Sequence, residues 1–254
     1  MNTCSDLKYR RAVKLVSYTA TDKDYQTEGA IADLDSLVAF CARVSNPSNQ
    51  YNTETSDKLI KYLIKHKHWS PFEMASVCLE ITTTRDIARQ ILRHRSFSFQ
   101  EFSQRYADPV KDLSFCYREA RLQDNKNRQN SIETQNELLS QYWLQMQEKV
   151  HQAAEDAYKW AVNNGIAKEV ARAVLPEGLM LSRMYMHGTI RSWIHYIETR
   201  TDPSTQKEHR LIAAECAQEI AKVMPKITEF VSHNDSSVVK VKNTDIKVSE
   251  WIGL

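Results

Sequence analysis

The sequence predicts an α+β fold: one domain in which a mixed or antiparallel sheet is flanked by helices. Short stretches of alternating apolar and polar residues, typical of half-buried strands, occur among longer stretches with apolar residues at helical spacing. No internal repeat and no long linker divides the 254 residues, of which 42% are hydrophobic. A chain of this length and composition can bury one large core, so we expect residues 1–254 to form a single domain.

The first half of the chain is predicted to alternate strands with amphipathic helices. The side chain of Asp33 can cap the first helix, and Thr83 with Asp86 three residues later resembles a capping box for the third. In chain order we predict a strand over 12–18, a helix over 34–44 that stops before Asn46-Pro47, a helix over 56–66, a strand over 77–82, and a helix that begins at 83 and ends in Arg93-His94-Arg95.

The second half is predicted to be mainly helical. Asn163-Asn164-Gly165 ends the longest helix and Pro176 ends the next, because glycine favours a helix C-terminus and proline cannot continue a helix. We predict an extended segment or ordered loop over 96–106, an irregular polar loop over 107–130, helices over 131–163 and 166–174, an extended segment over 179–188, and helices over 190–199 and 206–224. The tail over 226–254 has no predicted structure.

Charge and glycine content restrict how the chain can bind anions. The 34 Lys and Arg against 32 Asp and Glu leave a formal charge of +2, so no global basic field favours nucleic acids or membrane surfaces. The five glycines are Gly29, Gly165, Gly178, Gly188 and Gly253. Because none lies within eight residues of another, neither a dinucleotide-binding G-x-G-x-x-G loop nor a Walker loop can be written. Side chains must therefore hold any phosphate.

Cysteine usage and hydropathy indicate the compartment. The five cysteines are Cys4, Cys41, Cys78, Cys116 and Cys216. Their number is odd and no C-x-x-C spacing occurs, so we expect neither a disulfide framework nor a metal site. The N-terminus lacks the apolar stretch of a signal peptide, and no run of about 18 apolar residues could span a membrane. The sequence predicts a cytoplasmic protein with no membrane partner.

The densest group of unusual residues lies within 93–106. The basic triplet Arg93-His94-Arg95 follows a predicted helix, and the carboxylate of Glu101, the hydroxyl of Ser103 and the guanidinium of Arg105 come next. Arginine can hold a phosphate in two parallel hydrogen bonds, while Glu and Ser can bind the edge of a base or sugar. The simpler alternative is a solvated basic helix end.

The triplet and the Ser103 that follows after seven residues read R-H-R-x7-S, and this segment resembles the signature of the flavin-dependent thymidylate synthases. Further blocks resemble that family in the same order within 35–225, which leaves the N-terminal arm, the 107–130 loop and the tail outside the resemblance. These blocks are Ala42-Arg43-Val44-Ser45, His68-Trp69-Ser70-Pro71-Phe72-Glu73, Ala88-Arg89-Gln90, residues 101–106, residues 169–176, and residues 191–200.

The resemblance implies a catalytic domain with methyltransferase activity. Members of this family bind FAD, oxidise NADPH, and methylate dUMP to dTMP with 5,10-methylenetetrahydrofolate as carbon donor and hydride transfer from the flavin to the uracil ring. All of these ligands are anions, which fits side-chain arginines in a chain of small net charge. The resemblance also implies a thymidylate synthase-complementing protein type of fold, a homotetramer with active sites shared between subunits, and no nucleic-acid partner.

The resemblance also assigns contact residues. Contacts to dUMP are assigned to Gln90, Arg93, Glu101, Phe102, Ser103, Gln104, Arg105, Arg172 and Arg200. Contacts to FAD are assigned to Ser45, Ser70, Arg93, His94, Arg95, Glu101, Thr189, Arg191 and His195. The spacing of Gln90 and Arg93 places both on one helical face, so both can reach a single ligand.

Three residues are expected to act near the reacting ring. By the resemblance, Arg200 lies near N3 and O2 of uracil, where a cation favours the ionised ring and activates it for hydride attack. His68 lies by the pyrimidine and the folate. We expect Ser103 to orient the nucleotide and not to act as a nucleophile, because the spacing shows no base beside it.

One position departs from the family pattern, and two rival functions stay open. Four residues after Arg200 the family often has a His that contacts FAD, whereas this chain has Ser204. His209 lies five residues further and cannot simply substitute, and His66 is expected at the surface. One rival is a module that binds RNA or DNA through the arginines with Phe97 and Phe99. The other is a flavin reductase without methylation activity.

Overall fold

The computed structural model describes residues 12–28 and 31–231. Its helices and strands, in chain order, are β1 (Val13–Tyr18), α1 (Lys23–Glu28), α2 (Leu34–Ala42), η2 (Pro47–Asn49), α3 (Ser56–Lys65), η3 (Ser70–Glu73), β2 (Ser76–Thr84), α4 (Arg85–Ile91), β3 (Ser98–Glu101), α5 (Pro109–Asp112), β4 (Arg121–Gln123), β5 (Ser131–Glu133), α6 (Glu137–Asn163), α7 (Lys168–Ala171), η4 (Arg172–Val174), β6 (Leu181–Thr189), α8 (Ile190–Arg200), α9 (Lys207–Ala221) and η5 (Pro225–Phe230). Cys4 and the tail after residue 231 lie outside the described residues.

The main sheet has four antiparallel strands in the order β1-β2-β6-β3. Its centre is the pair β2 and β6, which stay in register from Ser76 opposite Thr189 to Thr84 opposite Leu181. The edges are β1 and the short β3. An antiparallel sheet with helices confirms the predicted α+β class, the strands predicted over 12–18 and 77–82, and the extended segment predicted over 179–188.

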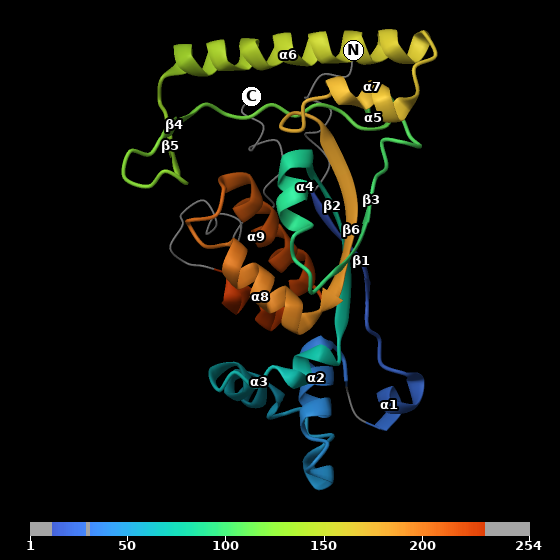
Figure 1. The fold of residues 1–254 in the computed structure, drawn as a ribbon. Coiled ribbons are helices and arrows are strands. Elements are labelled where there is room, and N and C mark those ends of the chain that lie inside the picture. The colour runs from blue at the N-terminus through green and yellow to red at the C-terminus, as the bar shows by residue number, and fades with distance from the viewer. Residues whose placement is uncertain (1–11, 29–30, 232–254) are drawn as a thin grey trace.

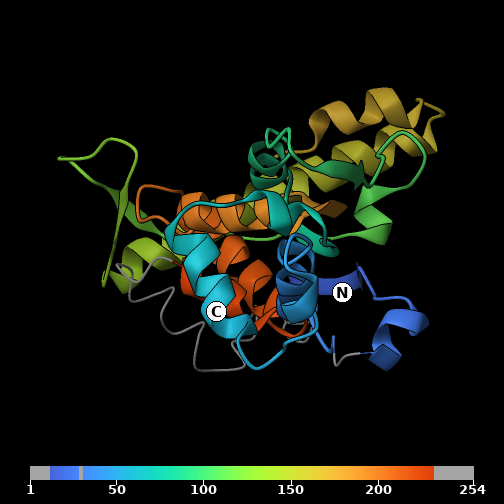
Figure 2. The same cartoon turned by 90° about the horizontal axis from the view of Figure 1, so that it is seen from below.

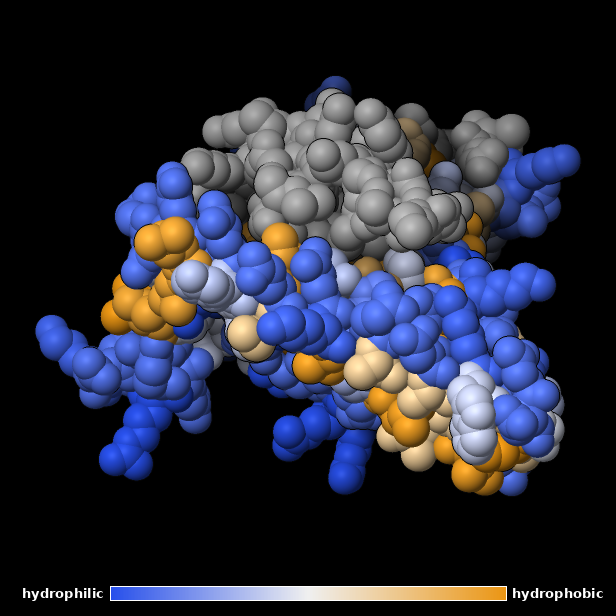
Figure 3. Space-filling model, turned by 90° about the horizontal axis from the view of Figure 1, so that it is seen from above, coloured by the Kyte–Doolittle hydropathy of each residue, from blue (hydrophilic) through white to orange (hydrophobic). Residues whose placement is uncertain are grey.

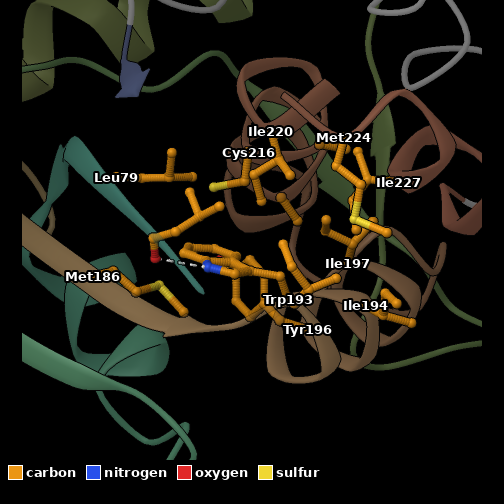
Figure 4. Packing of buried hydrophobic residues seen from close by; sticks show 14 of the residues in the cluster. Leu79, Met186, Trp193, Ile194, Tyr196, Ile197, Cys216, Ile220, Met224 and Ile227 are labelled. Atoms are coloured by element: carbon orange, nitrogen blue, oxygen red, sulfur yellow. Dashed lines mark hydrogen bonds between the residues drawn. The ribbon is translucent and has the colours of Figure 1, made fainter. Parts of the chain in front are cut away.

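The core lies on one side of this sheet. In β2, Val77, Leu79 and Ile81 are fully buried, whereas the residues between them are half-buried, as expected for a strand with one covered face. Helices α4, α8 and α9 cover that face (Figure 1). The largest buried side chain, Trp193 of α8, also donates from Nε1 to the carbonyl of Val77 at 3.1 Å, which ties α8 to the central strand (Figure 4).

Helices α2 and α3 lie together beyond the end of the sheet near α8. Asp33 caps α2 as predicted, because its carboxylate accepts from the backbone N–H of Ser36 at 2.8 Å. Seen from below, α2 and α3 (blue to cyan) lie in front of α8 and α9 (orange to red) (Figure 2). The segment after α3 therefore runs beside α8, where several predicted site residues lie.

The long helix α6 lies apart from the sheet, at the opposite end of the molecule from α3 (Figure 1). Tyr158 and Ala161, near its C-terminus, are buried in a second, smaller cluster with Phe115 and Met180. Its N-terminal half instead exposes a run of large apolar side chains: Leu138, Leu139, Tyr142, Trp143, Met146 and Val150. Apolar residues (orange) are visible among hydrophilic ones in the view from above (Figure 3).

Three local predictions are wrong. The 107–130 loop is not irregular throughout, because α5 and the hairpin β4–β5 form within and just after it. The helix predicted from 131 begins at 137, since 131–133 form β5 and Asn136 provides the cap. The cap of α4 is Thr84 and not Thr83, because β2 stays paired with β6 through Thr84. Helix α1 has no counterpart among the predicted elements. No helix in the described ranges is long and apolar enough to cross a membrane.

Candidate functional site

The basic triplet lies where α4 ends. After Ile91 the chain turns, with the backbone N–H of His94 donating to the Ile91 carbonyl at 3.1 Å. The side chains of Arg93 and Arg95 are exposed, and neither has an acidic partner among the residues that the structure describes. The partial negative charge of a helix C-terminus favours cations at this place. The triplet thus presents two guanidinium groups that no acidic side chain of the described residues neutralises.

Arg200, the last residue of α8, meets the middle of the triplet. Its Nε donates to Nε2 of His94 at 2.9 Å. Because a guanidinium can only donate, Nε2 of His94 must carry a lone pair. Burial, followed by the charges of Arg200 and Arg93, lowers the pKa of His94 to about 4, so this imidazole is neutral at physiological pH. Arg200 therefore keeps an uncompensated charge within the described part of the chain.

Gln90 lies in the last turn of α4 and is held from α9 by His209. The Nδ1 atom of His209 lies 3.2 Å from Oε1 of Gln90, and its Nε2 lies 3.2 Å from the hydroxyl of Tyr196. His209 is fully buried, and burial, followed by the charge of Arg200, lowers its pKa to about 3. The sequence pattern did not indicate this role for His209. The available signal was its position three residues before Ile212, on the apolar face of α9.

Glu101, at the end of β3, is held by protein groups. Its carboxylate accepts from the hydroxyl of Ser182 at 2.8 Å and lies 3.8 Å from Nη1 of Arg85 and 3.7 Å from Nη1 of Arg89. The next residue, Phe102, continues the pairing with β6 through a bond from its N–H to the Arg183 carbonyl at 2.8 Å. These bonds fix the start of the segment that ends in Arg105.

A second group of predicted residues lies near α7. Nε of Arg105 lies 3.3 Å from the carboxylate of Glu169, and Nε of Arg172 donates to the Glu169 carbonyl at 3.3 Å. The hydroxyl of Ser103 accepts from the Arg105 N–H at 3.4 Å. Gln104 is 4% exposed, and its Nε2 has no hydrogen-bond partner in the described ranges. An unsatisfied buried amide is costly, which favours a ligand or partner group at this position.

A third group lies between α8 and the segment after α3. Arg191 forms an ion pair with Glu73, and the ring of His195 lies 5.1 Å from that of Trp69. Thr189 caps α8 by accepting from the Ser192 N–H at 3.3 Å. The ring centroid of His68 lies 5.9 Å from that of Tyr62 and 6.1 Å from that of His66. Ser70 is the first residue of η3, and the exposed Ser45 follows α2.

Only some of the predicted site residues come into contact within one chain. Gln90, His94 and Arg200 come together directly or through His209. Strand β3 leads away from the triplet towards α5 and α7 (Figure 1), and no hydrogen bond or ion pair among the described residues joins Arg105 or Arg172 to Arg200. The residues predicted to share one substrate therefore lie at two places on the chain.

Phe97 and Phe99 do not form a surface for nucleic-acid bases. The ring centroid of Phe97 lies 4.8 Å from that of Trp193 and 6.0 Å from that of Tyr196, and both phenylalanines pack against the main core. Rings held in this way are not free to stack on bases. In the described ranges, no group of three or more His, Cys, Asp or Glu side chains could hold a metal ion.

The arrangement suits an anionic ligand with a planar ring. The unpaired Arg93 and Arg95 can bind phosphate oxygens in pairs, which fits the diphosphate of FAD. The uncompensated Arg200 can stabilise negative charge on a ring, because an opposite charge nearby favours the ionised form of a titratable group. Side chains, and not a glycine loop, supply both functions.

Comparison with known proteins agrees with this chemistry. A sequence profile described as thymidylate synthase complementing protein matches residues 29–226. The chain is 49% identical over 195 residues to a protein of Paramecium bursaria Chlorella virus 1 named probable flavin-dependent thymidylate synthase, covering 77% of this chain and 89% of that protein. It is 47% identical over 207 residues to a flavin-dependent thymidylate synthase of Synechocystis sp., with coverage of 82% and 94%.

The fold is also similar to a solved structure. The match is to the crystal structure of the UMP/dUMP methylase PolB from Streptomyces cacaoi bound with 5-Br dUMP, with a TM-score of 0.69 and 25% sequence identity. It covers 86% of this chain and 93% of that chain.

Proposed function

Because this chain belongs to the thymidylate synthase complementing protein family, we propose that it methylates dUMP to dTMP with 5,10-methylenetetrahydrofolate as carbon donor and NADPH as reductant. It is a flavin-dependent thymidylate synthase, hence a methyltransferase of nucleotide biosynthesis, and its cofactor is FAD. The observation that carries the proposal is the contact between Arg200 and His94, which leaves a guanidinium uncompensated beside the signature triplet.

FAD is assigned to the triplet and to the third group. Arg93 and Arg95 would hold its phosphates, and the neutral His94 would lie against it without adding charge. His195, Arg191, Thr189, Ser70 and Ser45 would contact the rest of the cofactor, as the resemblance implies. When bound, FAD supplies the hydride that reduces the uracil ring during methylation.

The residues assigned to dUMP would bind the nucleotide and activate its ring without forming a covalent bond to it. Arg200 would stabilise negative charge at uracil N3 and O2, and His68 would lie by the pyrimidine and the folate. Ser103 accepts from a backbone N–H, and no imidazole or carboxylate among the described residues hydrogen-bonds to its hydroxyl. It would therefore orient the nucleotide together with Gln90, Glu101, Phe102 and Gln104, since a serine nucleophile needs an adjacent base.

We further propose a homotetramer in which two subunits complete each site. Two observations support this proposal. Arg105 and Arg172 lie apart from Arg200 within one chain, so another subunit would have to bring them to the same dUMP. The N-terminal half of α6 exposes Tyr142 by 60%, Met146 by 48% and Trp143 by 44%, and such a run of large apolar side chains is typical of subunit interfaces.

A labelled substrate tests the function. The protein loaded with FAD is incubated with [5-³H]dUMP, NADPH and methylenetetrahydrofolate, and tritium release and dTMP are measured. We expect both, with neither formed when any one co-substrate is omitted. A yellow protein that oxidises NADPH without releasing tritium would instead be a flavin reductase. Repeating the assay with NADH tests the choice of reductant.

Two further expectations stay proposals. We propose one catalytic domain over residues 1–254, with its family-like core within 35–225. We also propose a cytoplasmic location, where a reducing environment suits thiols such as those of Cys41, Cys78, Cys116 and Cys216. Fluorescence microscopy of the tagged chain in its native cell tests the location.

A further inference from the structure

A chain of side-chain hydrogen bonds runs through Gln90 from the core to the half-buried carboxylate of Glu208. We name it the Gln90 relay; its members are Tyr196, His209, Gln90, Gln206 and Glu208. Three of its four bonds join residues far apart in the sequence or on different helices: Gln90 lies on α4, Tyr196 on α8, and His209 and Glu208 on α9. The relay therefore fixes the end of α4 relative to two other helices.

One carboxylate sets the direction of the outer bonds. Glu208 accepts from Nε2 of Gln206 at 3.0 Å, and an ionised carboxylate can only accept. Burial raises the pKa of Glu208, but the charges of Arg118 and Arg121 outweigh burial and leave it lowered, so the group is ionised. Oε1 of Gln206 must then face Gln90, and it accepts from Nε2 of Gln90 at 2.8 Å.

The donors and acceptors of the two inner bonds follow from the orientation of Gln90. With Nε2 of Gln90 donating to Gln206, Oε1 of Gln90 faces His209, so Nδ1 of His209 must carry the proton. In the neutral imidazole Nε2 is then an acceptor, and the hydroxyl of Tyr196 donates to it at 3.2 Å. All four bonds donate in one direction, from the buried Tyr196 towards Glu208.

The outer end of the relay is anchored by the segment before β4 and by β4 itself. Nη2 of Arg121 donates to Glu208 at 2.6 Å, and Nη1 of Arg118 lies 3.3 Å from the same carboxylate. Arg118 also donates to Asp86, in the first turn of α4, at 2.8 Å. Both arginines are largely buried, with side chains 17% and 12% exposed. The region predicted as an irregular loop thus holds α4 at both its start and its end.

A pinned Gln90 amide offers a ligand a defined pattern. The relay uses one N–H of Nε2 and one lone pair of Oε1, which leaves one further donor and one further acceptor on the same side chain. Rotation of the amide by half a turn would exchange these two, and it would break both relay bonds. For a pyrimidine ring held in one place, a ring carbonyl can accept from the free N–H of Gln90 but would be repelled by its oxygen, so only one of the two orientations can match the ring.

We propose that His209 and Glu208 are positioning residues for dUMP: through the Gln90 relay they hold the Gln90 amide in the single orientation that binds the nucleotide. This inference rests on the proposed function, in which Gln90 contacts dUMP. It also gives the 107–130 region a role, because Arg118 and Arg121 supply the anchor of the relay.

Direct binding of dUMP to the FAD-loaded protein, measured by calorimetry, tests the relay. His209→Phe keeps an aromatic ring but removes both bonds, and we expect the dissociation constant for dUMP to rise about tenfold. His209→Asn keeps a donor near the Nδ1 position and should stay within about twofold of the wild type. Glu208→Gln removes the group that sets the direction, and it should weaken dUMP binding by about fivefold with kcat little changed.

Controls separate this role from general stability. Glu155→Gln changes a carboxylate that pairs with Lys159 on α6, away from the relay, and it should leave dUMP binding unchanged. In a Gln90→Leu background, His209→Phe should cause no further loss, because the residue through which it acts is gone. The proposal is overturned if the two substitutions weaken binding additively, or if folded His209→Phe and Glu208→Gln bind dUMP as the wild type does. If the wild type itself does not bind dUMP, the proposed function fails instead.

Discussion

Arg200 donates through Nε to a neutral imidazole, that of His94, over 2.9 Å. A carboxylate in that place would neutralise the guanidinium and lower its attraction for a substrate anion. A neutral histidine fixes the direction of the side chain and leaves its charge available. Burial keeps His94 neutral, so its partly buried position within the triplet leaves the charge of Arg200 available.

Arg200 is expected to be required for catalysis. Arg200→Gln should lower kcat/KM for dUMP by about 100-fold, because the cation that stabilises charge on the ring is lost. Tritium release from labelled dUMP measures this effect, and the flavin absorbance shows that the cofactor remains bound. Arg128→Gln, an exposed change in the β4–β5 hairpin, is the matched control. Equal activity in both variants would contradict the role of Arg200.

Acid should destabilise the fold through His209 and His94. The pKa of His209 is about 3 in the fold, against 6.5 for a free histidine, and that of His94 is about 4. Between its folded pKa and 6.5, each of these histidines is protonated in the unfolded chain but not in the folded chain. The free energy of unfolding should therefore fall as pH drops below about 6.5. Urea denaturation at a series of pH values measures the slope. The slope should be shallower in His209→Asn, and an unchanged slope would contradict this assignment.

Gly188 is expected to be essential for packing. A Cβ at this position would lie 2.4 Å from Cδ1 of Phe97, whose ring is held 4.8 Å from that of Trp193. Gly188→Ala should therefore reduce the free energy of unfolding by about 1–3 kcal/mol, as overpacking does elsewhere. Gly178→Ala is the control, because a Cβ there meets no atom within 4 Å. Adding Phe97→Leu should restore part of the lost stability.

The exposed face of α6 is expected to hold subunits together. Trp143→Glu should shift the protein from tetramers to smaller species, because a charge cannot be buried in an apolar interface without a partner. Sedimentation velocity measures the change in mass. Val44→Glu places the same charge on another exposed apolar residue, near the end of α2, and should leave the assembly intact. If the Trp143→Glu variant still forms tetramers, the exposed face of α6 is not the interface.

Removal of a buried charge at Asp35 should stabilise the protein above pH 6. Burial, partly opposed by a bond from the Lys226 N–H, raises the pKa of this 8% exposed carboxyl from 3.8 to about 6. The folded chain thus holds a proton that the unfolded chain loses, and the contribution of Asp35 to stability falls as pH rises from about 4 to about 6. Asp35→Asn should add about 1–2 kcal/mol at neutral pH and nothing near pH 4. The exposed Asp156→Asn serves as control in the same denaturation experiments.

Local pattern was sufficient to predict much of the fold. The alternation in 77–82, the Asp33 cap and the apolar stripes of α3, α8 and α9 depend on neighbours in the sequence, and all appear in the structure. The elements that were missed depend on distant partners. The segment with β4 is polar, and it is held by bonds such as that from Arg121 to Glu208, 87 residues away.

In the candidate site, too, some residues can be found from the local sequence and others depend on distant contacts. The triplet and Ser103 could be found from their spacing alone, and so could the place of the triplet at a helix end. His209 could not, because its bond to Gln90 spans 119 residues and its own helix gives it the pattern of an ordinary core position. The division of Arg105 and Arg172 from Arg200 depends on the path of β3, which the sequence does not reveal.

The exposed guanidinium groups of Arg93 and Arg95 have an evolutionary consequence. In a glycine loop the anion is held by the backbone, so its affinity cannot change without altering the path of the chain. Here the groups that would hold phosphate are side chains at the end of a helix, outside the core. Single substitutions can therefore retune nucleotide affinity while the fold stays the same, and homologues can diverge in ligand preference at little cost to their stability.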